Sequence, residues 1–194
     1  MVVSPGPSGA GPGLTTGSAA SSGTMLATVD LDGTQVALRR ARRPDLPALV
    51  ALLAADDLGA TRDGIRGPAD RDAYERAFQA IDQDPAQLLL VADVDGRVVG
   101  TLQLSFIPGL SRRGALRAQI ESVRVAPTMR RRGLGEALFT WSIAEAHRRG
   151  CALVQLTTDK TRADAHRFYD RLGFVASHEG LKLDLTGGNG SVSP

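Results

Sequence analysis

The sequence lacks the features that mark disulfide-rich and membrane-spanning proteins. It contains one cysteine, Cys151, which excludes an intramolecular disulfide framework and offers no cysteine spacing typical of a metal site. Its longest nearly apolar stretch, Leu46 to Ala55, has about half the length of a membrane span, and we interpret it as a core helix. The N-terminal region has neither the basic start nor the apolar block of a signal peptide. These absences predict a cytoplasmic protein without a membrane segment.

A large excess of charge of one sign is also missing. The formal net charge is +2, which is too small to indicate nucleic acid, so we do not expect a nucleic-acid partner. The arginines nevertheless form clusters. A solvated surface accounts for most of them, but an anionic cofactor would explain the run from Arg130 to Arg132. The chain has three histidines, and no pair of them has metal-ligand spacing with a carboxylate, so we predict no metal.

The remaining composition is that of one globular domain. The chain has 194 residues, of which 42% are hydrophobic, enough for a proper core. Residues 1–24 are rich in Gly, Ser, Pro, Thr and Ala and carry no charged side chain, so we predict a disordered leader. Met25 is then an alternative start of translation. Residues 187–194 have a similar composition and predict a flexible tail, which leaves residues 25–186 as the folded domain.

Strand-type and helix-type patterns alternate within this domain. Asp95-Gly96 separates two β-rich runs and is a strong hairpin signal. Gly150 and Gly173 follow two helix-type runs, as glycines at helix ends do. We predict strands at residues 36–40, 88–93, 97–106, 116–126, 152–157, 174–176 and 181–185, and helices at residues 44–55, 70–81, 134–149 and 163–172. This order indicates a mixed α/β architecture.

The first candidate site is the basic, glycine-containing loop from Arg130 to Glu136. It lies between a predicted strand and a long predicted helix. A helix N-terminus presents unpaired backbone N–H groups and partial positive charge, which suit an anion. Gly133 and Gly135 let a diphosphate approach the backbone, and the arginines add charge-assisted donors. The loop lacks the Gly-Lys-Ser/Thr ending of a P-loop and the third glycine of a dinucleotide-binding fingerprint. An ordinary basic helix start is the structural alternative.

The second candidate is the segment from Ala165 to Phe174. Here a predicted helix carries Phe168 and Tyr169 and ends at a glycine. Taken alone, Tyr169 fits the edge of the core. A tyrosine hydroxyl also serves as a proton donor where it faces a leaving group.

Together these segments resemble the GNAT superfamily of N-acetyltransferases. The strand ending at Val125, the Arg130–Glu136 loop with its helix, and the Ala165–Phe174 segment stand in that family's order and spacing, most clearly over residues 119–174. The resemblance implies a central twisted mixed sheet of about six or seven strands flanked by about four helices. It also implies transfer of the acetyl group of acetyl-CoA to a primary amine by direct attack.

The resemblance further implies how acetyl-CoA is bound. Backbone N–H groups from Arg131 to Glu136 hold the diphosphate, and the pantetheine arm adds like a strand along Val123 to Val125. The implied cofactor-binding residues are Val123, Val125, Arg130, Arg131, Arg132, Gly133, Leu134, Gly135, Glu136 and Arg162. Arg162 stands where the family often has asparagine, so the contact to the pantetheine arm must differ, with Thr161 or Asp164 as alternatives. A longer acyl-CoA is an alternative donor.

Two side chains are implied in proton transfer. An alkyl amine with a pKa of about 10.4, like that of lysine, must lose a proton before it attacks. Glu121 lies four residues before Val125, on the same face of a regular strand, and is the candidate base through a water. Asp159 is a weaker candidate, and a solvated carboxylate is the alternative role of Glu121. Tyr169 stands at the family's general-acid position and would protonate the departing thiolate.

The acceptor has no recognisable motif. We expect a small-molecule amine, and the abundant arginines favour an anionic one. Acetylation of a protein or aminoacyl-tRNA amine is an alternative, as is a non-catalytic acyl-CoA-binding regulatory module. Substrate choice is expected to depend on residues 56–69 and 108–114. Family members often dimerise, sometimes through their C-terminal strands, so a homodimer is an open alternative to a monomer.

Overall fold

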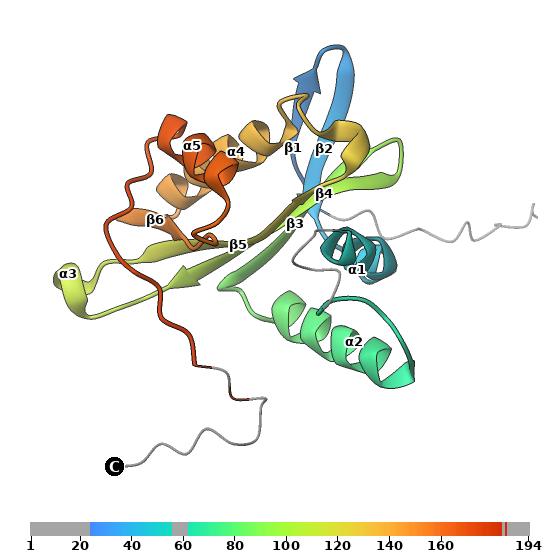
Figure 1. Ribbon diagram of the computed structural model, residues 1–194, viewed down its shortest axis with the longest axis horizontal. Coiled ribbons are helices and arrows are strands. Elements are labelled where there is room, and N and C mark those ends of the chain that lie inside the picture. Colours follow the sequence, from blue (N-terminus) through green and yellow to red (C-terminus); the bar gives the residue numbers. More distant parts are fainter. Residues whose placement is uncertain (1–23, 56–61, 184, 186–194) are drawn as a thin grey trace, which may run out of the picture.

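A six-stranded sheet forms the centre of the computed structural model, which describes residues 24–55, 62–183 and 185 (Figure 1). The strands follow one another in space as they do in sequence, in the order β1-β2-β3-β4-β5-β6. Every neighbouring pair is antiparallel except β5 and β6, which are parallel. The strands are β1 (Met25–Leu31), β2 (Thr34–Arg40), β3 (Gln87–Val94), β4 (Arg97–Ile107), β5 (Arg117–Val125) and β6 (Leu153–Leu156).

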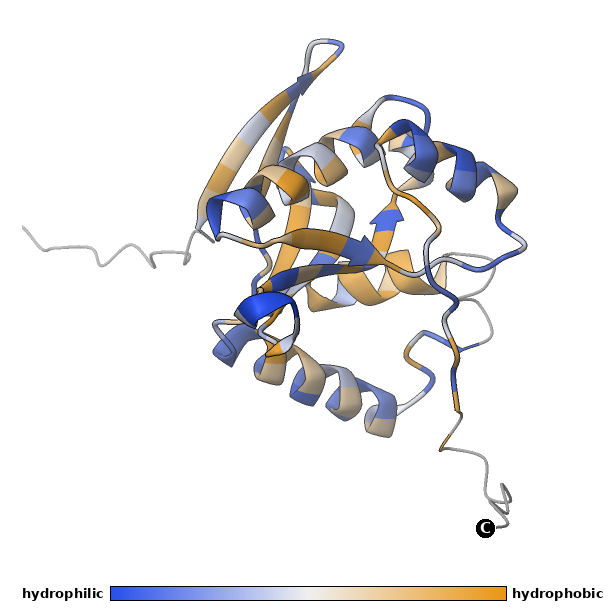
Figure 2. Cartoon of the chain, turned by 90° about the vertical axis from the view of Figure 1, so that its left-hand side faces the viewer, coloured by the Kyte–Doolittle hydropathy of each residue, from blue (hydrophilic) through white to orange (hydrophobic). Residues whose placement is uncertain are grey.

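Helices cover both faces of this sheet. The α-helices are α1 (Leu46–Ala54), α2 (Pro68–Gln83), α3 (Ser111–Gly114), α4 (Leu134–Arg148) and α5 (Ala163–Arg171), and two short 3₁₀ helices are η1 (Arg43–Asp45) and η2 (Pro127–Met129). Helices α4 and α5 lie over one face and α1 and α2 over the other (Figure 1). The apolar residues of the strands lie between these layers (Figure 2).

Alternation along the strands divides the core into two clusters. Leu88, Leu90 and Leu104 point toward α4 and pack with its buried Leu138 and Phe139. Leu89 and Val91, one residue out of phase with the first set, pack with α1 and α2. Successive side chains of a strand point to opposite faces, so one strand supplies both clusters.

The predicted mixed α/β fold is confirmed, with bounds that differ by one or two residues for most elements. The first hairpin was missed in part, because β1 was not predicted. Its signal is present in Asp32-Gly33, where both residues have positive φ values of 51° and 80°. The expected loop at residues 108–114 contains the single turn α3, within which Arg112 and Arg113 have left-handed φ values of 55° and 61°.

The two strands predicted at 174–176 and 181–185 are wrong for the residues that the structure describes. The alternating leucines suggested a half-buried strand. Instead, Leu181, Leu183 and Leu185 are 93%, 72% and 86% exposed. A strand needs hydrogen bonds to a neighbouring strand, and an alternating pattern of apolar residues does not supply them. Within the described segments, β6 pairs with β5 and with no later residues. The predicted leader up to residue 23 and the predicted tail lie outside the described residues.

The α1–α2 side of the sheet contains a buried charge cluster. Arg39 of β2 donates to Asp45 at 2.7 and 2.9 Å and to Asp93 at 3.1 and 2.7 Å. All three residues are less than a tenth exposed. Burial acts to raise the pKa of Asp45, but hydrogen bonds from Arg39 and from the backbone N–H of Arg42 outweigh it and leave the pKa below its ordinary value. The cluster ties β2, β3 and the start of α1 together.

None of the helices in the described segments is long and apolar enough to cross a membrane. In the same segments, no three His, Cys, Asp or Glu side chains come together as metal ligands would.

Candidate active site

The Arg130–Glu136 loop joins η2 to α4 and presents backbone donors at the start of that helix. Arg131 and Gly133 have positive φ values of 60° and 80°. Alternation between right- and left-handed backbone turns successive N–H groups toward one side, which creates an anion-binding concavity. Helix α4 has no side-chain N-cap, so its first N–H groups are not taken by a capping side chain. The loop can therefore hold a diphosphate.

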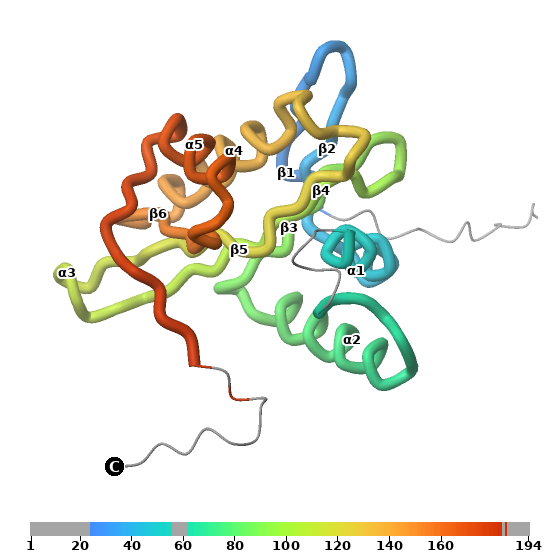
Figure 3. Tube along the Cα trace, in the orientation of Figure 1, coloured from blue at the N-terminus to red at the C-terminus, as the bar shows by residue number. Residues whose placement is uncertain are grey.

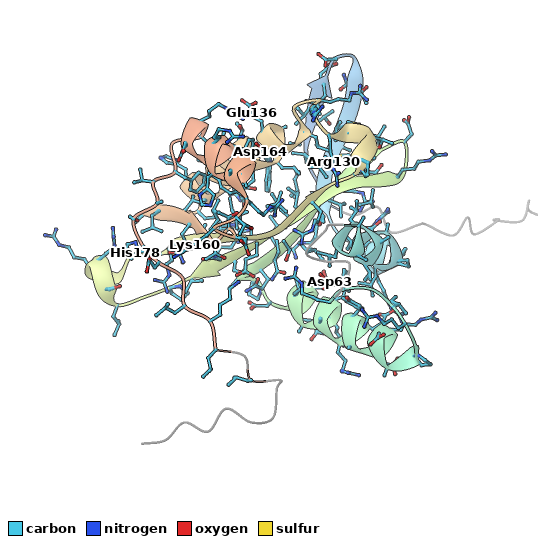
Figure 4. All side chains as sticks on the ribbon, in the orientation of Figure 1. Asp63, Arg130, Glu136, Lys160, Asp164 and His178 are labelled. Atoms are coloured by element: carbon cyan, nitrogen blue, oxygen red, sulfur yellow. The ribbon has the colours of Figure 1, made fainter. Side chains whose placement is uncertain are left out.

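The three loop arginines differ in their contacts. Arg132 donates from Nη2 to Thr34 Oγ1 at 2.9 Å and from Nη1 to Met129 Sδ at 3.5 Å. No side-chain hydrogen bond or ion pair to another described residue engages Arg130 or Arg131, and both are exposed. Figure 4 shows Arg130 and Glu136 at the two ends of this loop, on the same side of the sheet as Asp164 at the start of α5.

The second half of β5 has an unpaired edge. Pairing between β5 and β6 runs from Arg117–Leu153 to Ile120–Leu156 and stops there, although β5 continues to Val125. Among the described residues, the backbone of residues 121–125 thus has no strand partner on its other edge, opposite β4. Backbone N–H and C=O groups are obligatory hydrogen-bonding groups, so such an edge is a template for an extended ligand.

A β-bulge interrupts β5 at Ser122. Ser122 has a φ of 54°, and the register with β4 shifts between Thr101–Arg124 and Gln103–Glu121. The extra residue reverses the alternation of side chains beyond it. Ile120, Val123 and Val125 all pack in the core beneath α4.

Glu121 and Val125 therefore do not share a face of β5, and that prediction is wrong. It assumed a regular strand, whereas the bulge places Glu121 on the opposite face, toward α1 and α2. Glu121 is exposed there. It lies next to the unpaired edge of β5, and its assignment as the base stays a prediction.

A row of polar side chains, three glutamines and one serine, lies beside Glu121 on that face and is called the amide row below. Residues Gln87, Ser105, Gln119 and Gln155 are direct neighbours across β3, β4, β5 and β6. Gln155 donates to Gln119 at 2.6 Å, and Ser105 donates to Gln87 at 2.6 Å. Gln119 is only 8% exposed. The sequence analysis missed this row, although polar residues at alternate positions of otherwise apolar strands were the available signal.

Tyr169 lies in an aromatic cluster on the α4 side. Its ring centroid is 5.4 Å from that of Phe139, 5.5 Å from that of Phe168 and 6.0 Å from that of Phe174. Burial raises the pKa of the Tyr169 hydroxyl, and the nearby charges of Arg162 and Arg124 oppose that shift. The phenol is therefore protonated at neutral pH, as a proton donor must be.

The loop after β6 approaches the same region. Asp159 accepts from the backbone N–H and the hydroxyl of Thr161, and these hydrogen bonds lower its pKa. A carboxylate stabilised in this way is a weaker base. The hydroxyl oxygen of Thr158 is buried and has no hydrogen-bond partner among the described residues. Arg162 precedes α5 and acts electrostatically on Tyr169.

Two surface hollows and His147 lie apart from this region, whereas His166 and the segment of His178 contact the loop after β6. Two surface hollows of about 540 and 490 Å³ are lined by α2 and by the C-terminal half of α4, and neither is lined by any of the predicted site residues. His147 is near the end of α4, and His178 lies in the segment after α5, where its Nδ1 is 2.8 Å from Ser177 Oγ. Tyr169, the second half of β5 and the basic loop are the elements that the fold brings to one side.

Comparison with known proteins identifies this arrangement. Residues 50–174 match the model of the Acetyltransferase (GNAT) family. The chain is 31% identical over 141 residues to an aminoalkylphosphonate N-acetyltransferase of Salmonella typhimurium, over 73% of this chain and 86% of that protein. It is 36% identical over 90 residues to a glucosamine 6-phosphate N-acetyltransferase of Trypanosoma brucei brucei, over 46% and 59% of the two chains.

A solved structure agrees with these sequence matches. The crystal structure of a transcriptional regulator from Bacillus halodurans C-125 has a TM-score of 0.73 and 46% sequence identity, and the match covers 77% of this chain and 99% of that one. The family model covers more than half of the present chain, including the loop and Tyr169. The chain therefore belongs to the GNAT family and is an acetyl-CoA-dependent N-acetyltransferase.

Proposed function

We propose that the protein transfers the acetyl group of acetyl-CoA to the primary amine of a small molecule by direct attack. The observation that carries this proposal is the unpaired edge of β5 at residues 121–125. This edge lies between an anion-binding loop and a protonated, half-buried Tyr169. A phosphate-bearing thioester with an extended arm fits these three elements together.

The chain holds the donor with groups of two kinds. When bound, acetyl-CoA supplies an activated thioester. The first N–H groups of α4, together with the side chains of Arg130 and Arg131, bind the diphosphate. The unpaired backbone of β5 fixes the pantetheine arm, and a backbone N–H near Val125 polarises the thioester carbonyl. The buried hydroxyl of Thr158 and the side chain of Arg162 take the place of the asparagine contact expected near this arm.

Proton transfer is divided between the two faces of β5. On one face, Glu121 accepts the proton of the incoming ammonium through a water, so that the neutral nitrogen attacks the carbonyl carbon. The carbon–sulfur bond breaks as the carbon–nitrogen bond forms. On the other face, Tyr169 donates its phenolic proton to the departing thiolate. The acetylated nitrogen then releases its second proton to solvent, and the Tyr169 phenolate and the Glu121 carboxyl return to their starting protonation states by exchange with solvent. The products are an N-acetylated amine and coenzyme A.

The acceptor reaches Glu121 across the amide row. Gln119 lies two residues before Glu121 on the same face, about 7 Å away along the strand. A small polar amine can contact both residues at once. The two relatives act on amines that carry a phosphonate or a phosphate. An anionic amine therefore fits both these relatives and the abundance of arginine, 21 of the 23 basic residues being arginine beside Lys160 and Lys182.

A regulatory role is the second candidate. The name of the Bacillus halodurans protein, a transcriptional regulator at 46% identity, favours it. A module that only binds acyl-CoA needs neither a proton donor nor a surface that binds an acceptor amine. A macromolecular amine is the remaining alternative for the acceptor.

The test is release of free thiol from acetyl-CoA across a panel of amines. The panel contains aminoalkylphosphonates, amino sugars and their phosphates, polyamines, amino acids and short peptides. Release that depends on one class of small amine supports the proposal. Silence across the panel, with acetyl-CoA still raising the melting temperature, contradicts it in favour of a macromolecular acceptor or a binding module. Silence without a thermal shift rejects the donor site itself.

A further inference from the structure

We propose that the β1–β2 hairpin is part of the donor site and that Thr34 is a positioning residue for the diphosphate. The role of the hairpin in this proposal is indirect. It holds the Arg130–Glu136 loop through Arg132. The inference rests on the proposed function, because it concerns the binding of coenzyme A.

The contacts between hairpin and loop join distant parts of the chain. Thr34 Oγ1 accepts the hydrogen bond from Arg132 Nη2 at 2.9 Å across 98 positions of sequence. A Cβ at Gly133 would lie 3.7 Å from Leu31 Cδ2, so the leucine lies over the backbone of that glycine. The Cα trace shows the hairpin and the loop before α4 at the same end of the molecule (Figure 3).

The hairpin is a firm support at this point. Its turn contains Asp32 and Gly33, and Gly33 donates its N–H to Asp30 Oδ1 at 2.8 Å. Thr34 follows directly and pairs with Leu31 across the hairpin. On the inner side β2 pairs with β3 from Ala37 to Arg40, so the central sheet anchors the base of the hairpin three residues from Thr34.

The loop needs such a support. Arg131 has a φ of 60°, a conformation that costs a residue with a Cβ energy and persists only where neighbouring groups hold it. Arg132, the next residue, is anchored on both sides, by Thr34 and by Met129 of η2. The loop arginines therefore have two roles. Arg130 and Arg131 supply positive charge to the diphosphate, and Arg132 fixes the loop backbone whose N–H groups bind that diphosphate.

This division has a measurable signature. Backbone N–H donors that are already held in position lose little conformational entropy when the diphosphate binds. This gain in affinity does not depend on ionic strength. Attraction between exposed arginines and a diphosphate is screened by salt. Loss of the Thr34 contact should therefore weaken binding equally at low and high salt, whereas loss of the Arg131 charge should weaken it mainly at low salt.

The experiment measures the Kd of coenzyme A by calorimetry at low and high salt. Thr34→Val should raise Kd roughly three- to tenfold at both salt concentrations, as expected for one hydrogen bond. Thr34→Ser, which keeps the hydroxyl, should restore binding. Thr28→Val is the matched control, because Thr28 is an exposed threonine of the same hairpin. Arg131→Gln should weaken binding with a clear salt dependence.

Two further measurements separate positioning from general damage. Pantetheine, which lacks the diphosphate, should bind Thr34→Val and the wild type alike. A double variant with Arg132→Gln should show less than the sum of the two single effects, because both substitutions remove one contact. Equal Kd values for Thr34→Val and the wild type, or an equal loss of pantetheine binding, reject the role of the hairpin alone. A wild type that does not bind coenzyme A rejects the proposed function and this role with it.

Discussion

The two polar regions of the sheet are built in opposite ways. Around Arg39, two carboxylates and a guanidinium are buried, and the guanidinium forms four hydrogen bonds to those two carboxylates. Around β5, the strand bulges at Ser122, its edge loses its partner after Ile120, and the hydroxyl of Thr158 is buried without a partner among the described residues. Both regions bury polar groups, but only the first satisfies them internally.

The difference indicates what each region is for. A buried polar group without a partner costs free energy, so it persists where a ligand completes it. The Arg39 cluster needs no ligand and fastens β2, β3 and α1. The β5 region leaves polar groups without partners among the described residues, and under the proposed function an extended ligand completes it. Substitutions in the first region should therefore change stability, and substitutions in the second should change binding or turnover.

Arg39→Met should have the largest effect on folding. Among the described residues, it leaves Asp93 with only the backbone N–H of Gly96 as a donor, and it removes the main partner of Asp45. Removing one partner of a buried ion pair costs about 3–5 kcal/mol, and denaturant unfolding measures this loss. Arg43→Met is the matched control, because Arg43 pairs with Glu75 on the surface at 76% side-chain exposure. Its cost should stay below about 1 kcal/mol.

Equal destabilisation by the two variants would contradict the assignment of a buried, stabilising cluster. Acid titration sharpens the test. The folded-state pKa of Asp45 is lowered, so its contribution is present above the unfolded-state pKa and is lost as the pH falls through the folded value. The wild type should therefore lose stability below about pH 4, and Arg39→Met should show a flatter dependence on pH there.

Tyr169→Phe should have the largest effect on turnover. The change removes the proton donor and keeps the ring packing against Phe139 and Phe168. We expect kcat to fall roughly 10²-fold, as is typical for loss of a general acid. The Kd of acetyl-CoA and the melting temperature should stay close to those of the wild type. Phe168→Leu serves as the packing control, and a kcat unchanged in Tyr169→Phe would refute the acid role.

Glu121→Gln should have a smaller effect that depends on the acceptor. We expect kcat/KM to fall about tenfold or more for an alkyl amine that is protonated at neutral pH. An acceptor whose amine is already neutral should be affected little, since it needs no base. Glu179→Gln, at an exposed carboxylate that pairs with Lys160, is the control. An equal loss of kcat/KM for the protonated and the neutral amine would indicate a structural or binding role for Glu121.

The same contrast explains what could be predicted from the sequence. The apolar periodicities of β3, β4 and α4 reflect local geometry, so these elements were confirmed. The family motif marks the Arg130–Glu136 loop, whose role in binding the cofactor stays a prediction. The bulge at Ser122 has no glycine or other local signal, and it misled the face argument for Glu121. The strand predicted at 181–185 depended on a partner edge that no local pattern specifies. The contact of Thr34 with Arg132 spans 98 positions and is a consequence of the fold alone.

Gln119→Leu should have the smallest effect and should separate the two faces of β5. Gln119 accepts from Gln155 and lies on the face of Glu121, whereas the donor arm is proposed to run along the strand edge. Loss of one hydrogen bond should raise the KM for the amine roughly threefold, with kcat and the Kd of acetyl-CoA nearly unchanged. Gln79→Leu, on the exposed surface of α2, is the control. A weaker acetyl-CoA affinity in Gln119→Leu would show that the amide row belongs to the donor side, and the acceptor would then have to approach Glu121 from elsewhere.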